Sequence, residues 1–263
     1  MAGVDHVSAP SALTDEQVAG YLARIGLPRP ERPDREALAA LQRAHLGAVP
    51  FENLSVRLGE PIVLEPGALV EKIVGRRRGG FCYELNGAFA ELLRALGFRV
   101  TLLAARVFGK ERLGPPFDHL ALRVVADGEA WLVDVGFGRF SELPLRWDER
   151  GEQADPGGVF TLVPHGDELD VRQDGDPQYR LDQRAYELAD FAPTCWWQAT
   201  WPDSHFRRAA TCSRLTADGR ITISGTRLIR TAADGSRTEQ ELGEAGTPAA
   251  YRTHFGITLD RLP

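Results

Sequence analysis

The sequence predicts an α+β fold in which a helical N-terminal part precedes a strand-rich middle part and a mixed C-terminal segment. Apolar residues up to Gly97 recur at helical spacing, whereas those from Phe98 onward alternate as residues of strands do. An Asp-Gly pair at 127–128 stands between two apolar runs, which is typical of a two-residue hairpin turn. These observations predict parts at 1–97, 98–205 and 206–263.

The N-terminal part contains four predicted helices, each with apolar residues along one face. They are expected after Thr14, where Gln17 completes a capping box, after Asp34, over 67–74 and from Cys82.

The fourth helix carries Cys82 in or next to its first turn. Apolar residues follow at offsets of four, seven, eight and eleven from Leu85, and Gly97 is a plausible stop. Unpaired N–H groups and the positive end of the helix dipole favour a thiolate over a thiol at this position. The arginines at 76–78 add positive charge nearby. We therefore expect Cys82 to act as a nucleophile.

A predicted hairpin in the middle part brings His119 and Asp134 together. With 127–128 as the turn, counting outward sets Ala121 opposite Asp134, and His119 lies two residues further along the same face. Such diagonal neighbours lie roughly 7–8 Å apart, within reach of an imidazole and a carboxylate. A carboxylate inside an apolar strand also needs a polar partner. Cys82, His119 and Asp134 thus form a candidate catalytic triad.

The rest of the chain contains shorter predicted elements separated by Gly- and Asp-rich turns. Strands are predicted over 100–107, 159–163, 170–172, 212–215 and 220–230, an exposed loop over 151–158, and a closing helix over 249–254.

Composition narrows the functional class. A net charge of −6 and a pI near 5.6 argue against a nucleic-acid or anionic-membrane binder. Three cysteines without regular spacing fit a reducing compartment and form no zinc pattern. The first 14 residues lack the apolar stretch of a signal peptide, and no run approaches 18 apolar residues. We expect a cytoplasmic enzyme without a metal site.

Several motifs resemble those of the arylamine N-acetyltransferases. The specific ones are Arg-Gly-Gly-Phe-Cys at 78–82 with Asn86, Asp-His at 118–119, and Val-Asp-Val-Gly-Phe-Gly at 133–138. Weaker matches occur at 50–54, 190–193, 204–206 and 212–213. The resemblance extends from about Tyr21 to about Arg230, without a departure at the triad positions.

The resemblance implies an N-terminal helical bundle, a central β-barrel-like domain and a C-terminal α/β lid, with a cysteine-protease-like triad. It implies a ping-pong acyltransferase that moves an acetyl group from acetyl-CoA to arylamines, hydrazines or arylhydroxylamines through a thioester on Cys82. No permanently bound cofactor is implied. Phe51, Phe137 and Phe206 are expected to line an apolar slot for the acceptor. Glu52 and one of Arg77 or Arg78 are expected to form a buried ion pair that braces the active-site helix.

Three alternatives stay open at this point. An amide synthase of the same superfamily uses such a triad to acylate an aryl amine from a polyketide thioester. A cysteine protease or transglutaminase-like enzyme has the same order of triad residues, but the chain lacks Cys-Gly-Ser-Cys-Trp surroundings at Cys82. A non-catalytic binding module is disfavoured by the intact triad. The preferred acceptor, the CoA contacts and the oligomeric state are not determined by the sequence.

Overall fold

The computed structural model describes residues 11–110 and 112–263. The first ten residues, part of the segment without a signal-peptide pattern, lie outside this range. The helices are α1 (Asp15–Ile25), α2 (Arg35–Ala48), α3 (Leu54–Leu58), α4 (Pro66–Val70), α5 (Cys82–Ala95), α6 (Ala192–Thr200) and α7 (Gly243–Phe255), with short η1 (Glu71–Gly75), η2 (Leu188–Phe191) and η3 (His205–Arg207) turns. None of the helices in this range is long and apolar enough to cross a membrane.

The predicted N-terminal helices are present. Thr14 and Gln17 form the capping box of α1, and the Asp34 side chain accepts from the Ala37 N–H at the start of α2. The third predicted helix is divided into α4 and the π-helical turn η1. After α5, Gly97 has a φ of 92°, a left-handed conformation that ends helices at little cost for glycine.

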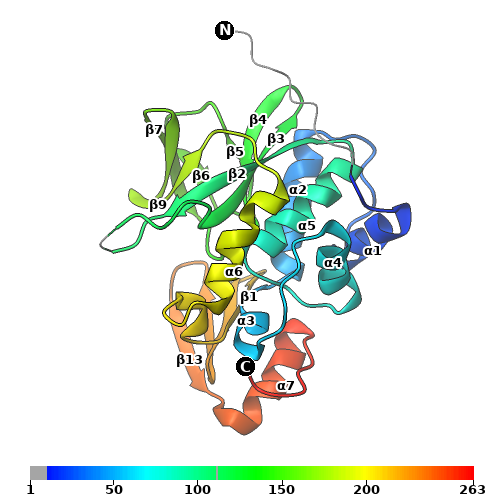
Figure 1. Ribbon diagram of the computed structural model, residues 1–263, viewed down its shortest axis with the longest axis vertical. Helices are drawn as coiled ribbons and strands as arrows, with labels where there is room; N and C mark the ends of the chain where they lie inside the picture. Colours follow the sequence, from blue (N-terminus) through cyan, green and yellow to red (C-terminus); the bar gives the residue numbers. More distant parts are fainter. Residues whose placement is uncertain (1–10, 111) are drawn as a thin grey trace.

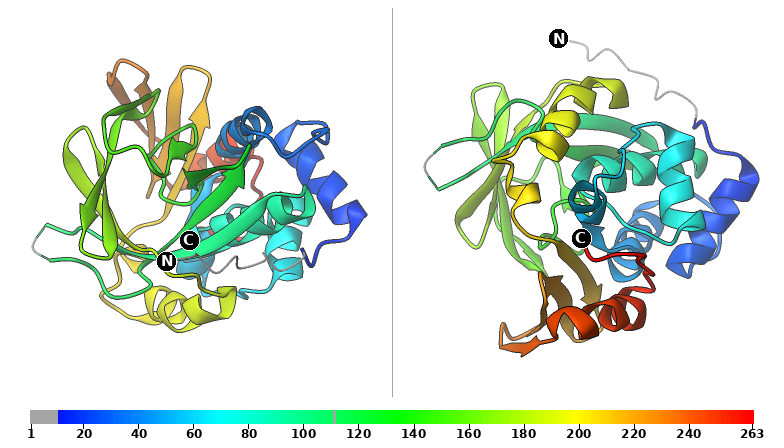
Figure 2. Two further views of the ribbon diagram at one scale, coloured as in Figure 1. Left: turned by 90° about the horizontal axis from the view of Figure 1, so that it is seen from above. Right: turned by 60° about the horizontal axis from the view of Figure 1, so that its bottom comes forward.

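The strands in the described range form two antiparallel sheets. The larger one has the order β5-β4-β3-β2-β9-β8-β7-β6 and curves into the barrel-like shape seen in Figure 2, left. Its strands are β2 (Arg99–Val107), β3 (His119–Ala126), β4 (Glu129–Val133), β5 (Leu145–Arg146), β6 (Gln153–Asp155), β7 (Gly158–His165), β8 (Glu168–Gln173) and β9 (Asp176–Asp182).

The second sheet lies at the opposite end of the molecule, next to α7 (Figure 1). Its order is β1-β10-β11-β12-β13, formed by β1 (Phe51–Glu52), β10 (Thr211–Thr216), β11 (Gly219–Ser224), β12 (Arg227–Ala232) and β13 (Arg237–Glu241). Because β1 pairs with β10, the N-terminal part contributes a strand to the C-terminal sheet. The helices, barrel-like sheet and C-terminal α/β segment confirm the predicted fold class.

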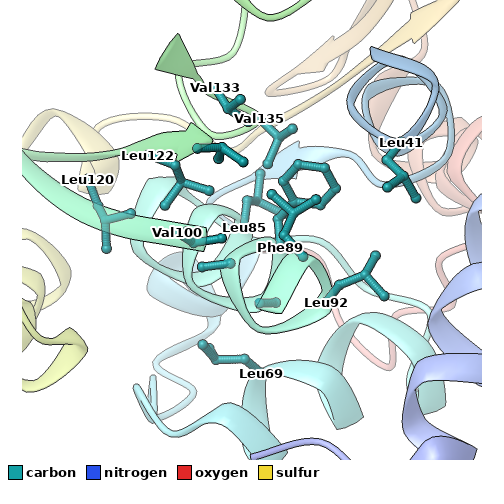
Figure 3. Packing of buried hydrophobic residues seen from close by; sticks show 14 of the residues in the cluster. Leu41, Leu69, Leu85, Phe89, Leu92, Val100, Leu120, Leu122, Val133 and Val135 are labelled. Carbon is teal, nitrogen blue, oxygen red and sulfur yellow. The ribbon is translucent and has the colours of Figure 1, made fainter. Parts of the chain in front are cut away.

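Helix α5 is the centre of the core, and its packing sets the position of the functional site. Leu85, Phe89 and Leu92 are fully buried and meet residues of the barrel-like sheet such as Val100 and Leu122 (Figure 3). Burying a large apolar side chain stabilises a fold by about 1.5–3 kcal/mol. The helix is therefore anchored along its length, with its first residue, Cys82, lining the same cavity as His119 at the start of β3.

Two sequence predictions need correction. The segment 151–158 is not only a loop, because it contains β6 and the start of β7. The predicted strand over 220–230 is two strands, separated by a turn in which Gly225 has a φ of 59°. In both cases the boundary lies at glycine or polar residues, which occur both in turns and at strand ends. The closing helix, expected to include 249–254, is α7, which contains that range.

Candidate active site

Cys82 is the first residue of α5. The segment before it contains Gly79 and Gly80, where the backbone packs too closely against neighbouring atoms for a side chain. A Cβ on Gly79 would lie 1.8 Å from the Pro50 carbonyl oxygen, so no other residue fits there. The Gly80 carbonyl accepts from the Glu52 N–H at 2.8 Å. Cys82 itself is 4% exposed and lines a cavity. The thiol therefore lies in the first turn of α5, as predicted.

The hairpin of β3 and β4 has the predicted register. Ala126 pairs with Glu129, and Asp127 and Gly128 have φ angles of 52° and 78°. Both central residues thus have the positive φ of a type I′ turn, which Asp-Gly sequences favour. His119 Nε2 lies 2.6 Å from Asp134 Oδ2, and both side chains are buried. This contact leaves the other ring nitrogen, Nδ1, for the Cys82 thiol, whose pKa the imidazole acts to lower.

Asn86, one turn along α5 from Cys82, holds the aspartate in place. Its Nδ2 donates to Asp134 Oδ1 at 2.8 Å and to the Leu120 carbonyl at 2.6 Å, and its Oδ1 accepts from the Val135 N–H at 2.9 Å. The nucleophile helix and the His–Asp hairpin are therefore joined by one buried amide. The sequence motif contained Asn86, but only the fold shows what it contacts.

The loop after Asp134 passes close to Cys82. The Gly136 N–H donates to Asp134 Oδ1 at 2.9 Å. A Cβ on Gly136 would lie 2.7 Å from Cys82 Cα, which explains a glycine at this position. Tyr83 braces the other side, since its hydroxyl shares its one proton between the carbonyls of Phe117 and Asp118, at 2.9 and 3.1 Å, just before His119. Contacts at the end of β4 and just before β3 therefore both support the site.

The charges of the triad are coupled. Burial acts to lower the pKa of His119, but the charge and hydrogen bond of Asp134 outweigh it and raise that pKa to about 10. Burial raises the pKa of the Cys82 thiol, while His119 opposes this. The expected help from the nearby arginines is not found, because Arg78 is neutralised by Glu52. A cationic imidazole is therefore the group that favours the thiolate here.

The cavity above the thiol has a volume of about 300 Å³. Phe51, Phe137 and Phe206, half-buried, line it together with Cys82 and His119. The Phe137 ring lies 5.1 Å from the His119 ring, and those of Phe51 and Phe206 lie 6.5 Å apart. Flat aromatic molecules suit such a cavity, because ring pairs at these distances attract one another.

Asn53 is a second residue whose role the sequence did not indicate. Its Nδ2 donates to the carbonyls of Phe206 and Ala209 at 2.7 and 2.8 Å, and its Oδ1 accepts from the Thr211 N–H at 2.7 Å. The segment that carries Phe206 is thereby attached to the N-terminal part. In the part of the chain that the structure describes, no group of three or more His, Cys, Asp or Glu residues is placed to hold a metal ion.

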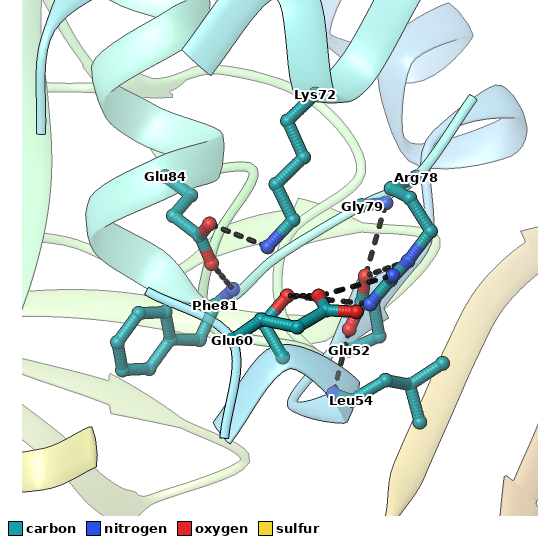
Figure 4. Close-up of polar contacts among 9 residues, drawn as sticks. Glu52, Leu54, Glu60, Lys72, Arg78, Gly79, Phe81 and Glu84 are labelled. Carbon is teal, nitrogen blue, oxygen red and sulfur yellow. Dashed lines mark hydrogen bonds and ion pairs between the residues drawn. The ribbon is translucent and has the colours of Figure 1, made fainter. Parts of the chain in front are cut away.

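A buried charge network lies at the start of α5, the helix that carries Cys82 (Figure 4). Arg78 Nε lies 2.9 Å from Glu52 Oε1, and the Glu52 carboxylate also accepts from the Leu54 N–H at 2.6 Å. Lys72 pairs with Glu84 at 2.5 Å, and Glu84 accepts from the Phe81 N–H at the start of α5. The ion pair expected at Glu52 is therefore present, and its partner is Arg78.

Replacing Glu52 with glutamine is expected to lower the free energy of unfolding by about 3–5 kcal/mol, because it removes the 2.9 Å partner of the buried Arg78 guanidinium and leaves only the longer contact with Glu60 at 3.4 Å. Urea unfolding measures this loss. Glu129→Gln is the matched control, since the pair of Glu129 with Arg146 is exposed and such pairs contribute about 0–1 kcal/mol. Equal stabilities of the two variants would show that the buried pair is not needed for folding.

Comparison with known proteins places these features in context. An N-acetyltransferase family model matches residues 34–262. The chain is 37% identical to an arylamine N-acetyltransferase of Mycolicibacterium smegmatis, over 93% of each chain. It is 33% identical to one of Escherichia coli, over 91% of this chain and 88% of the relative.

Solved structures give the same result. The M. smegmatis arylamine N-acetyltransferase superposes with a TM-score of 0.87 at 34% identity, over 94% of this chain and 93% of that one. The Mycobacterium marinum enzyme, solved in complex with CoA, superposes with a TM-score of 0.84 at 32% identity, over 91% and 92% of the two chains. The whole architecture, and not only the motifs, is therefore shared.

Proposed function

The chain belongs to the arylamine N-acetyltransferase family, and from this premise we propose that Cys82, His119 and Asp134 are its catalytic residues. The protein is an acyltransferase that moves an acetyl group from acetyl-CoA to arylamines. The observation that supports the assignment is the 2.6 Å contact of the imidazole with a buried carboxylate, with Cys82 and His119 in the wall of the same cavity.

In the first half-reaction, the Cys82 thiolate attacks the thioester carbonyl of acetyl-CoA. The new C–S bond forms at Cys82, the bond to the CoA sulfur breaks, and the imidazolium of His119 protonates the departing CoA thiolate. The enzyme is left as a thioester with a neutral imidazole. Asp134 holds the ring with its Nε2–H toward the carboxylate, so that Nδ1 faces the sulfur.

In the second half-reaction, the acceptor amine attacks the acetyl carbon. His119 takes a proton from the attacking nitrogen at Nδ1, and the tetrahedral intermediate collapses with Cys82 leaving as a thiolate. This restores the thiolate–imidazolium pair and releases the amide. Phe51, Phe137 and Phe206 are proposed to hold the acceptor ring, in keeping with their place in the cavity wall.

Intact-mass measurement tests the proposal. Mixing the protein with acetyl-CoA is expected to add the mass of one acetyl group, and an arylamine is expected to discharge it. Peptide mapping locates the group, which should be on Cys82. A protein that gains no acetyl group from acetyl-CoA, or that keeps it in the presence of arylamines, would contradict the mechanism. Loading by carrier-protein thioesters alone would point to an amide synthase.

We further propose that the enzyme acts in the cytoplasm on xenobiotic amines. The three cysteines are unpaired thiols, which supports a reducing compartment. Fractionation of cells that produce the protein checks this, since the acetyl-transfer activity should remain with the cytosolic fraction.

A further inference from the structure

A second cavity, of about 200 Å³, lies between α2, the segment that follows Asp134, and the C-terminal sheet. It is lined by Arg43 of α2, Arg139 of the segment after Asp134, and Arg220 of β11. Glu142 is the acidic residue in its wall. It shares no lining residue with the cavity above Cys82, and the reaction described above does not use it.

The charges in this cavity do not balance. Arg43 pairs with Glu142 at 3.4 Å, and its side chain is 58% exposed. Asp155, which lies close by, accepts from the backbone N–H groups of Glu142 and Leu143. Arg139 and Arg220 form no ion pair within 4.0 Å with a carboxylate of the described residues. Two guanidinium groups are therefore left with a surplus of positive charge.

Arg220 is the more informative of the two. It is half-buried, and Nη1 donates to Ser213 Oγ at 3.2 Å, a neutral partner. Burial lowers the pKa of Arg220 to about 10; Glu142 opposes this, and the positive charge of Arg139 adds to it. A guanidinium withdrawn from water without a counter-charge is costly, and an anion in the cavity would remove that cost.

We propose that this cavity binds a phosphate-bearing anion between Arg139 and Arg220. Guanidinium groups present parallel N–H donors that match the oxygens of a phosphate, so two of them can hold one phosphoryl group. The volume is sufficient for a phosphate or diphosphate.

The position also connects the cavity to the active site. Arg139 follows Asp134 by five residues, and the residue that Arg220 contacts, Ser213, pairs with Phe51 of the acceptor slot.

Two sources of the anion have this chemistry. One is CoA itself: β10 runs from Thr211 at the active-site cavity to Thr216 at this one, roughly 17 Å at the rise of a strand, a span that an extended phosphopantetheine arm can cover. The other is a free phosphate compound that binds beside the acetyl-transfer site. The CoA case rests on the proposed function, whereas binding of a free anion does not.

Titration calorimetry of the full-length protein with inorganic pyrophosphate tests the site directly. We expect binding to the unaltered protein and at least about a tenfold weaker affinity in Arg139→Gln and Arg220→Gln. Arg139 is exposed, so its variant keeps the test informative if Arg220→Gln fails to fold. Arg230→Gln is the control, because Arg230 is an exposed arginine of the same sheet outside the cavity and its loss should leave the affinity unchanged.

Kinetics distinguish the two sources. If CoA phosphates occupy the cavity, Arg139→Gln should raise the KM for acetyl-CoA about tenfold relative to the KM for S-acetyl-N-acetylcysteamine, an acetyl thioester without phosphates. If a free anion occupies it, pyrophosphate binding falls in the variant while this ratio of KM values stays the same. Absence of pyrophosphate binding in the unaltered protein, or an affinity in both arginine variants equal to that of the unaltered protein, would overturn the proposal. The calorimetric result stands whether or not acetyl transfer is observed.

Discussion

Replacing Cys82 with serine is expected to lower kcat/KM for acetyl transfer by at least about 10⁴-fold, equivalent to about 5.4 kcal/mol of transition-state stabilisation. A serine hydroxyl is far less acidic than a thiol, so the cationic imidazole that favours a thiolate cannot produce an alkoxide at neutral pH. The measurement is initial rate with acetyl-CoA and an arylamine, together with the intact mass of the variant. No acetyl group should be added to it.

Cys195→Ala is the matched control for this experiment. Cys195 is also buried, at 3% exposed, but it lies in α6 and lines a different cavity from Cys82. Its loss should leave the rate within about twofold and the acetylated mass unchanged. If Cys82→Ser kept substantial activity, or Cys195→Ala lost it, the assignment of the nucleophile would be wrong.

Replacing Asp134 with asparagine is expected to lower kcat/KM by about 10³–10⁴-fold. An asparagine can keep its oxygen toward the Asn86 amide and the Gly136 N–H, which leaves its NH₂ group facing His119 Nε2. The imidazole then has to carry its proton on Nδ1, the nitrogen that must accept one from the nucleophile. The protein stays folded, while the tautomer is wrong for catalysis.

The same variant should change how stability depends on pH. The pKa of His119 is about 10 in the folded protein, above the ordinary value of 6.5, so the folded state binds the imidazole proton more tightly than the unfolded chain. This contribution to stability is fully present below about pH 6.5 and is lost as the pH rises toward about 10. Without the Asp134 charge, burial lowers the pKa of His119 and Cys82 is left to oppose it.

Urea unfolding at pH 6 and at pH 9 measures the difference. In the unaltered protein, stability should fall between these two values, and in Asp134→Asn it should fall less. Asp176→Asn, which alters an exposed carboxylate on β9, should behave as the unaltered protein. A variant with full activity and an unchanged pH dependence of stability would remove Asp134 from the mechanism.

The parts of the site that could be predicted are those determined by short-range rules. The Asp127-Gly128 turn requires positive φ at both residues, and this fixes the pairing of β3 with β4 and hence the faces of His119 and Asp134. The periodicity after Leu85 likewise places Cys82 in a first turn. The aromatic residues of the cavity came from the resemblance, because periodicity alone does not separate a cavity wall from a core.

Other features depend on contacts between distant segments. Arg77 and Arg78 are adjacent and chemically alike, and only the fold places Arg78 against Glu52. Trp196 and Trp201 lie among apolar residues of the chain, yet they are 69% and 48% exposed. The pairing of β1 with β10, 160 residues apart, has no local signature at all.

The amino-acid sequence by itself therefore determined the helical and strand-rich parts of the fold and the placement of Cys82, His119 and Asp134, because turn geometry and helix periodicity act over a few residues. The expected chemistry came from the resemblance to a known family. Only the tertiary structure decided what surrounds these residues: the Asn86 bridge, the choice of Arg78 as the partner of Glu52, and the arginine-lined second cavity. Each of these features forms between distant segments that pack together through apolar burial. Because apolar burial is non-directional, the sequence contains no local pattern that predicts which polar groups will come into contact.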